Sequence, residues 1–234
     1  MGGPGALNGK TGIFLQVRLS STRLPRKALL PIEGKAIITH AMESLRLMSA
    51  DSYVLVTDKE SSREVEPYAS DAGFLVFQGP RDDVLRRFVL AAEFFGVDTI
   101  IRATGDNPLV DSTLAAMLIE AHRSISADYS GFDGPPIGSG VEILKTSALI
   151  QADAITSDGY DREHVSPYLY LHPEKFRINR TPAPAEFCLP DSLVTIDTAN
   201  DYEYIRRLYA DLYRGSPLGV MEIIPWLVQN RRPV

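Results

Sequence analysis

The stretch from Gly12 to Lys27 constrains the fold more than any other part of the chain, because an apolar run in it leads directly into a cationic loop. The run is typical of a parallel strand buried on both faces and comprises Ile13, Phe14, Leu15 and Val17. The loop carries cations and hydroxyls, namely Arg18, Ser20, Ser21, Thr22, Arg23, Arg26 and Lys27. Ligands of open α/β sheets bind at the carboxyl ends of strands, where such side chains suit a polyphosphate. A basic surface loop is the alternative, but the position after a buried first strand favours a phosphate site.

Strand and helix patterns alternate along the rest of the chain. We expect strands at 52–57, 74–77, 98–103, 140–144, 176–178 and 192–196, and helices at 36–48, 61–73, 84–95, 112–125, 202–213 and 221–228. Ser61-x-x-Glu64 and Thr198-x-x-Asp201 have the form of capping boxes, whereas single aspartates, Asp82 or Asp83 and then Asp111, are expected to cap two other helices. The alternation indicates an α/β fold with a mostly parallel sheet and right-handed crossovers.

Length and charge restrict the class of protein. A chain of 234 residues is enough for one sizeable α/β domain, and a net charge of −6 argues against nonspecific nucleic-acid binding. Cys188 is the single cysteine, which permits no intrachain disulfide and fits a reducing compartment. No apolar stretch approaches the roughly 20 residues that a bilayer span needs. Residues 1–11 are too polar for a signal peptide, so we expect a flexible leader and a cytoplasmic protein without membrane contact.

An acidic turn follows the strand expected at 98–103. Asp106 lies in the segment from Thr104 to Asp111, flanked by glycine and proline, and it faces the same crevice as Arg18 in a parallel sheet. Mg²⁺ takes hard oxygen ligands, often one or two carboxylates together with phosphates and water. Asp106 fits that need, although an Asp-Asn-Pro turn taken alone is only a turn.

The segment from about 126 to 180 has a looser pattern, and we interpret it as an excursion from the sheet or a lid. Glu142 is a candidate lining residue, and a solvent-facing strand position is equally compatible with the pattern. A short helix at 160–170 carries Arg162, His164 and Tyr168, which suit a substrate carboxylate. The alternatives are an ion pair of Arg162 with a neighbouring acid on the same helix and a His164 satisfied within the core.

Several of these segments together resemble a known family. Arg18-x-x-Ser21-Thr22-Arg23-Leu24-Pro25-x-Lys27 is similar to the signature of the cytidylyltransferases that make CMP-activated sugar acids, most of all to their spore-coat polysaccharide biosynthesis branch. Further blocks follow in family order: Asp82-Asp83-Val84-Leu85-x-Arg87, Thr104-Gly105-Asp106-x-Pro108-Leu109, Gly140 to Leu144, Arg162-Glu163-His164-Val165-x-Pro167-Tyr168 and Ile196-Asp197-Thr198-x-x-Asp201. Ser20 and Arg26 depart from the pattern, since the branch often has glycine there.

The resemblance implies a single Rossmann-like nucleotidyltransferase domain over residues 12–234, whose excursion at 126–180 makes a homodimer. It implies transfer of CMP from CTP to an acidic sugar, with Mg²⁺ on Asp106 and Asp197. The residues implied for catalysis are Arg18, Lys27 and Asp106. The nucleotide contacts implied are Arg18, Ser21, Arg23, Lys27, Arg81 and Thr104, and the acceptor contacts are Glu142, Arg162, His164 and Tyr168.

Two other interpretations remain open from the sequence. One is a nucleotidyltransferase that uses another base or a non-acidic acceptor. The other is a catalytically silent relative that binds nucleotide. The chain has no Walker A motif, no Gly-x-Ser-x-Gly elbow and no Cys/His set with zinc spacing.

Overall fold

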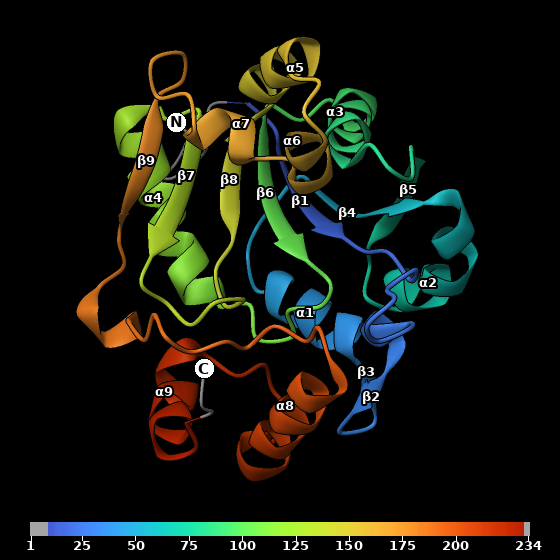
Figure 1. The fold of residues 1–234 in the computed structure, drawn as a ribbon, viewed down its shortest axis with the longest axis vertical. Helices are drawn as coiled ribbons and strands as arrows, with labels where there is room; N and C mark the ends of the chain where they lie inside the picture. The colour runs from blue at the N-terminus through green and yellow to red at the C-terminus, as the bar shows by residue number, and fades with distance from the viewer. Residues whose placement is uncertain (1–8, 232–234) are drawn as a thin grey trace.

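The apolar run near the N-terminus forms strand β1 (Thr11–Gln16), which is the third strand from one edge of a seven-stranded sheet (Figure 1). The structure is a computed structural model and describes residues 9–231. β1 pairs in parallel with β4 (Ser52–Asp58) on one side and with β6 (Thr99–Thr104) on the other. Pairing on both edges and helices on both faces explain why the run is apolar throughout.

The sheet has the strand order β5-β4-β1-β6-β8-β7-β9 and is mostly parallel, as predicted. β5 (Leu75–Gly79) extends the parallel half beyond β4. β8 (Glu142–Lys145) pairs antiparallel with both β6 and β7 (Tyr129–Asp133), and β9 (Ile178–Pro182) pairs in parallel with β7. The reversal at β8 places the predicted excursion at one edge of the sheet, so it continues the same sheet.

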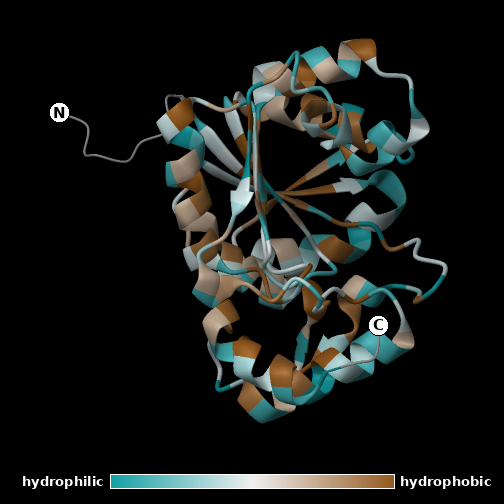
Figure 2. Cartoon of the chain, turned by 60° about the vertical axis from the view of Figure 1, so that its left-hand side comes forward, coloured by the Kyte–Doolittle hydropathy of each residue, from teal (hydrophilic) through white to brown (hydrophobic). Residues whose placement is uncertain are grey.

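Two layers of helices cover the sheet, and alternate residues of β1 face one or the other. Ile13 and Leu15 pack with α1 (Ile37–Leu45), α2 (Lys59–Asp71) and α4 (Ser112–Ile125). Phe14 points to the opposite layer, which is formed by α3 (Val84–Phe95), α5 (Thr146–Ile155) and α7 (Pro167–Tyr170). Figure 2 shows the hydrophobic strands running through the middle of the molecule between these layers.

A third apolar cluster lies beyond the carboxyl ends of β1 and β6. It joins α8 (Ala199–Leu212) and α9 (Val220–Gln229) to the small hairpin β2 (Pro31–Ile32) and β3 (Lys35–Ala36) (Figure 1). This cluster brings the segment before α8 next to the loop that follows β1.

The cap predictions are largely confirmed. Asp83 and Asp111 accept hydrogen bonds from the first turns of α3 and α4, and Thr198 forms a capping box with Asp201 at the start of α8. The capping box predicted at Ser61 is wrong, because Asp58 caps α2 and accepts from the Ser61 amide at 2.7 Å. The helix therefore begins earlier, directly after β4.

Other predicted boundaries are also wrong. Residues 192–196 form no strand, since only an isolated bridge between Ile137 and Leu193 involves them. The helix expected at 160–170 is two helices, α6 (Gly159–His164) and α7, interrupted at Val165, whose φ is 74°. The last edge strand begins at Ile178, later than predicted. Residues 1–8 of the predicted leader lie outside the described residues, and Thr11 already belongs to β1.

Acid is expected to destabilise the fold through His122 on α4. This side chain is 5% exposed and its Nδ1 lies 2.8 Å from Ser130 Oγ. Burial lowers the pKa of His122 to about 4, so below the unfolded value of 6.5 the unfolded chain binds a proton that the folded chain does not. The free energy of unfolding should therefore fall by about 2 kcal/mol between pH 7 and pH 5 on this account.

Urea titrations at both pH values measure the effect, with His122→Gln as the control. Because other groups also titrate in this range, the quantity to compare is the pH-dependent difference between the wild type and the variant. An equal loss of stability in both proteins would contradict the role of His122.

Candidate active site

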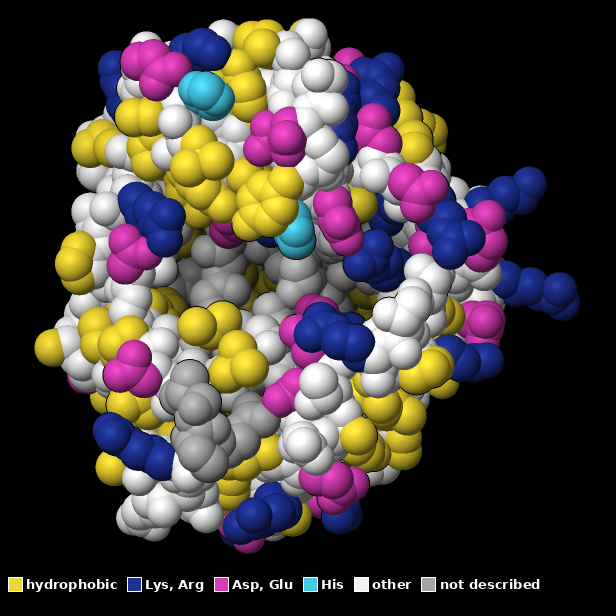
Figure 3. All heavy atoms as spheres, viewed as in Figure 1, with side chains coloured by type: hydrophobic (Ala, Val, Ile, Leu, Met, Phe, Trp, Pro, Cys, Tyr) yellow, Lys and Arg dark blue, Asp and Glu magenta, His cyan; other side chains and the backbone are white. Residues whose placement is uncertain are grey.

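A cavity of about 560 Å³ opens at the carboxyl ends of β1 and β6. Its walls come from the loop after β1, the turn after β6, the end of α6 and the segment before α8. Figure 3 shows this face of the molecule hollowed in the middle, with charged side chains of both signs at the rim. The cavity therefore lies where an open α/β sheet binds its ligands.

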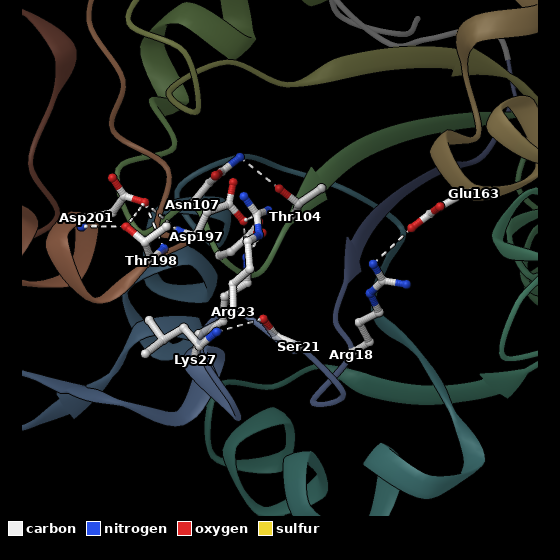
Figure 4. Close-up of polar contacts among 12 residues, drawn as sticks. Arg18, Ser21, Arg23, Lys27, Thr104, Asn107, Glu163, Asp197, Thr198 and Asp201 are labelled. Atoms are coloured by element: carbon white, nitrogen blue, oxygen red, sulfur yellow. Dashed lines mark hydrogen bonds and ion pairs between the residues drawn. The ribbon is translucent and has the colours of Figure 1, made fainter. Parts of the chain in front are cut away.

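Lys27 connects two carboxylates that are far apart in the sequence. Its Nζ lies 2.7 Å from Asp106 Oδ2 and 2.6 Å from Asp197 Oδ1, and its side chain is 12% exposed. Arg23 adds a second cation at 3.1 Å from Asp197 Oδ1 (Figure 4). Three separate segments thus place two carboxylates and two cations at one wall of the cavity.

Backbone contacts fix the turn that carries Asp106. The Gly105 amide donates to Gln16 O at 2.8 Å, which ties the turn to the end of β1. A side chain at Gly105 would begin 2.5 Å from a methyl group of Val17, so only glycine allows this approach. The Ile196 amide donates to Asp106 O at 3.1 Å and thereby holds the segment of Asp197 beside the turn.

The other side of the cavity is closed by an ion pair that the sequence did not indicate. Arg18 Nη2 lies 2.9 Å from Glu163 Oε1 on α6, and both side chains are about half exposed. Ser21 Oγ lies between the two walls and accepts from the Leu24 amide at 3.4 Å (Figure 4). Arg18 and Ser21 therefore line the cavity as the sequence predicted. The partner of Arg18, however, comes from a motif in which Arg162, His164 and Tyr168 were singled out and Glu163 was not.

Arg26 adopts a left-handed conformation, with φ at 56° and ψ at 27°. Glycine adopts this region without steric cost, whereas arginine rarely does. The side chain pairs with Glu64, away from the aspartates. The departure from the signature therefore changes the loop surface and adds no cation between Asp106 and Asp197.

A buried arginine supports the loop on which Arg81 lies. Arg87 is 1% exposed, and its guanidinium donates to Pro80 O at 2.8 Å and to Arg81 O at 2.6 Å. Burial lowers the pKa of Arg87 below its usual range. Sequence reasoning missed this role, although the Asp-Asp-Val-Leu-x-Arg block contains the residue.

A second cavity of about 420 Å³ adjoins the first and shares Arg102, Thr104 and Asn107 with it. Glu142 lies on its wall and accepts hydrogen bonds from Arg102, from Tyr129 Oη at 3.0 Å and from Ser166 Oγ at 2.7 Å. The predicted Glu142 thus lines the second cavity, held by three donors, of which Arg102 lines both cavities.

The structure places the other predicted acceptor contacts in different surroundings. His164 lines the first cavity beside Glu163. Arg162 points away from it, pairing with Asp153 of α5 and with Asp83 at 3.3 Å. Tyr168 is buried among the apolar residues of the α3–α7 layer and bonds to Lys175 Nζ at 2.8 Å. Neither Arg162 nor Tyr168 lines the two cavities.

The donors present fit a hard cation that brings ligands with its substrate. Within residues 9–231, no three His, Cys, Asp or Glu side chains form a group that could hold a metal by themselves. Mg²⁺ usually takes only one or two carboxylates and completes its shell with phosphates and water. Asp106 and Asp197 supply that pair at the edge of a cavity large enough for a nucleotide.

Comparisons with known proteins agree with this architecture. The profile of the family described as Cytidylyltransferase matches residues 13–223. The spore coat polysaccharide biosynthesis protein SpsF of Bacillus subtilis strain 168 is 35% identical, with 94% of both chains covered. A 3-deoxy-manno-octulosonate cytidylyltransferase of Psychrobacter cryohalolentis is 32% identical over 55% of this chain and 53% of its own. The solved structure of a cytidylyltransferase from Leptospira borgpetersenii superposes with a TM-score of 0.87 at 28% identity, covering 96% of this chain and 98% of that one.

The Rossmann-like sheet, the cationic loop after its first strand and these relatives define a nucleotidyltransferase enzyme. The chain belongs to the cytidylyltransferase family. The resemblance that the sequence motifs indicated is thereby confirmed. In the described part of the chain, no helix combines the length and the apolar character that crossing a membrane requires.

Proposed function

We propose that this enzyme transfers CMP from CTP to a hydroxyl group of an acidic sugar and releases pyrophosphate, in the assembly of a surface polysaccharide or glycan. The observation that carries the proposal is the meeting of Lys27, Asp106 and Asp197 in the cavity beyond β1. The relatives add the chemical class, since one is named for spore coat polysaccharide biosynthesis and another for a sugar-acid cytidylyltransferase.

Binding and charge neutralisation would account for most of the catalysis. Arg18, Arg23 and Lys27 converge on the cavity and would hold the triphosphate, with their present carboxylate partners replaced by phosphate oxygens. The acceptor oxygen forms a bond to the α-phosphorus while the bond to the oxygen leading to the β-phosphorus breaks. The cations offset the negative charge that grows on the departing pyrophosphate.

Asp106 and Asp197 are the residues that would hold Mg²⁺. When bound, this ion offsets phosphate charge and lowers the pKa of the attacking hydroxyl. The carboxylates are oriented by the turn after β6 and by the segment before α8, respectively.

The second cavity is the proposed place of the acceptor. Glu142 lines the second cavity and would accept hydrogen bonds from sugar hydroxyls, and His164 lines the adjoining first cavity. Arg102 and Arg180 line the second cavity and would face the acid group. Arg162 and Tyr168, which the resemblance implies as acceptor contacts, take no part in this proposal because of where they lie.

A non-acidic acceptor is the second candidate, and one observation favours it. Both arginines of the second cavity already have acidic partners, Arg102 in Glu142 and Arg180 in Asp133. A neutral sugar would leave these pairs intact, whereas the phosphate of a polyol phosphate would compete for the arginines as a carboxylate would. A catalytically silent relative ranks lower, because the cavity keeps both aspartates beside Lys27, with Arg18 at its other side.

A pyrophosphate-release screen tests the proposal. The enzyme is supplied with CTP, GTP, UTP or ATP, with and without Mg²⁺, against sugar acids, neutral sugars and polyol phosphates. Release that needs CTP, Mg²⁺ and a sugar acid is the expected result. Release with another base or a non-acidic acceptor would support the second candidate, and nucleotide binding without any release would support the silent relative.

The remaining expectations are also proposals. We place the enzyme in the cytoplasm, where CTP is available, and we expect a homodimer that uses the segment 126–180. Residues 12–234 are proposed to fold as one domain.

Arg87 is expected to act on nucleotide binding through the loop of Arg81. Arg87→Lys keeps a charge but replaces the planar guanidinium, which contacts two carbonyls, with a single ammonium. We expect the KM for the nucleotide to rise about tenfold with kcat changed less than twofold, since loop position matters more for binding than for chemistry. Steady-state kinetics with varied CTP measure both constants. A fall in kcat at unchanged KM would contradict this role.

A further inference from the structure

We propose that Lys27 keeps the Asp106–Asp197 pair closed to free divalent cations, so that a metal ion enters the site only together with a nucleotide. This inference rests on the proposed function, which makes the pair a magnesium site. It assigns to Lys27 a role besides phosphate binding, namely selection of the metal–nucleotide complex over the free ion.

The first argument is geometric. Lys27 Nζ lies 2.7 Å from Asp106 Oδ2 and 2.6 Å from Asp197 Oδ1, so the ammonium is in hydrogen-bond contact with both carboxylates at once. Mg²⁺ binds carboxylate oxygens at about 2.0–2.1 Å. An ion held by the same two oxygens would take over the acceptors that now hold the ammonium and would bring a second positive charge close to it. Lys27 and a metal ion would therefore compete for this pair of carboxylates.

The second argument concerns where the ammonium can go. The backbone around Lys27 is fixed, since its amide donates to Leu24 O at 3.3 Å and its carbonyl accepts from the Leu30 amide at 3.1 Å. The side chain itself is nearly buried and ends at the cavity wall. Its flexible stem therefore allows the charge to move only into the cavity, where a triphosphate would offer new oxygen partners.

The third argument concerns charge. The two carboxylates have two cationic partners, Lys27 and Arg23, so the formal charge of the group is already balanced. A free divalent cation would have to displace the ammonium from the carboxylates. The site would then carry an excess of positive charge, and the displaced ammonium would have no negative partner. A metal–triphosphate complex brings negative charge in excess and gives the displaced ammonium a partner. The balance therefore favours the complex over the ion alone.

Binding of Mn²⁺ alone, without nucleotide, tests the proposal. Titrations followed by the electron paramagnetic resonance of free Mn²⁺ compare the wild type with Lys27→Gln, which removes the ammonium. Arg26→Gln is the matched control, because it removes one positive charge from the adjacent position while its partner is Glu64. We expect Lys27→Gln to bind Mn²⁺ about tenfold or more tightly than the wild type, and Arg26→Gln to bind it as weakly as the wild type.

The double variant Lys27→Gln/Asp106→Asn should lose the gained affinity, which would locate the new ion at the aspartate pair. An equal gain in Arg26→Gln, or no gain in a folded Lys27→Gln, would overturn the proposal. The wild type gives a second measurement that needs no variant. With the Mn²⁺ bound by CTP in a protein-free titration subtracted, the affinity of the wild type for Mn²⁺ should rise about tenfold or more when CTP is present. Equal affinity with and without CTP after this subtraction would also overturn the proposal.

Pyrophosphate release by the wild type separates this inference from the proposed function. If release occurs and Lys27→Gln gains no Mn²⁺ affinity, the enzyme is a cytidylyltransferase without this selection by Lys27. If Lys27→Gln gains affinity and no nucleotide gives pyrophosphate, Lys27 blocks the aspartate pair in a protein with another function.

Discussion

Replacing Asp106 by asparagine is expected to lower kcat by about a thousandfold or more while leaving the fold intact. The variant keeps the shape of the side chain but removes one of the two negative charges that meet at Lys27. The backbone contact that holds the turn, from the Ile196 amide to Asp106 O, does not depend on the carboxylate. The change should therefore act on the chemistry of the site and hardly on its architecture.

The measurement is pyrophosphate release at saturating CTP and Mg²⁺, together with thermal unfolding. Asp82→Asn is the matched control, because Asp82 also lines the cavity but belongs to the loop before α3 and not to the aspartate pair. Its side chain is exposed. That variant should retain kcat within about threefold. Unchanged turnover in Asp106→Asn would remove the aspartate pair from the mechanism.

Local signals account for the parts of the fold that the sequence predicted. The run at Ile13–Leu15 indicated a buried central strand because only a strand covered on both faces needs three successive apolar residues. The caps at Asp83 and Asp111 were predictable because a carboxylate directly before an apolar periodic segment satisfies free amides. The expected strand at 192–196 fails because an apolar run alone does not provide a neighbouring strand to pair with.

The part of the site that lies on a single loop could be predicted from the sequence. The parts whose geometry depends on contacts between distant segments were less predictable. The loop after β1 does reach the cavity, as its composition indicated. The pairing of Arg18 with Glu163 joins residues 145 positions apart, and it depends on the position of α6, which packs against α3 and α7. Arg162 was expected to pair within its helix or to face substrate. Its actual partners lie on α5 and before α3, which no local pattern contains.

Asp111 caps α4, as predicted, and also contacts α9, which lies far from it in the sequence. Replacing Asp111 therefore tests the packing of two distant segments. The side chain is 4% exposed. Its Oδ1 accepts from the Leu114 amide at 2.6 Å, as expected of a cap, while its Oδ2 accepts from the Val220 amide at 2.6 Å. One carboxylate therefore fixes the first turns of both α4 and α9, at the end of the turn that begins with Gly105 and Asp106.

Replacing Asp111 by alanine is expected to lower the free energy of unfolding by about 3 to 4 kcal/mol, because two buried amides lose a charged acceptor. Asp111→Asn keeps one acceptor oxygen and should lose about half as much. Asp83→Ala is the matched comparison, since Asp83 caps α3 through a single, more exposed hydrogen bond at 2.9 Å, and it should lose only about 1 kcal/mol. Urea titrations of the three variants measure these losses. If Asp111→Ala lost no more than Asp83→Ala, the connection from α4 to α9 would add nothing to stability, and the turn carrying Asp106 would be held by its other contacts, such as the backbone bonds to Gln16 and Ile196.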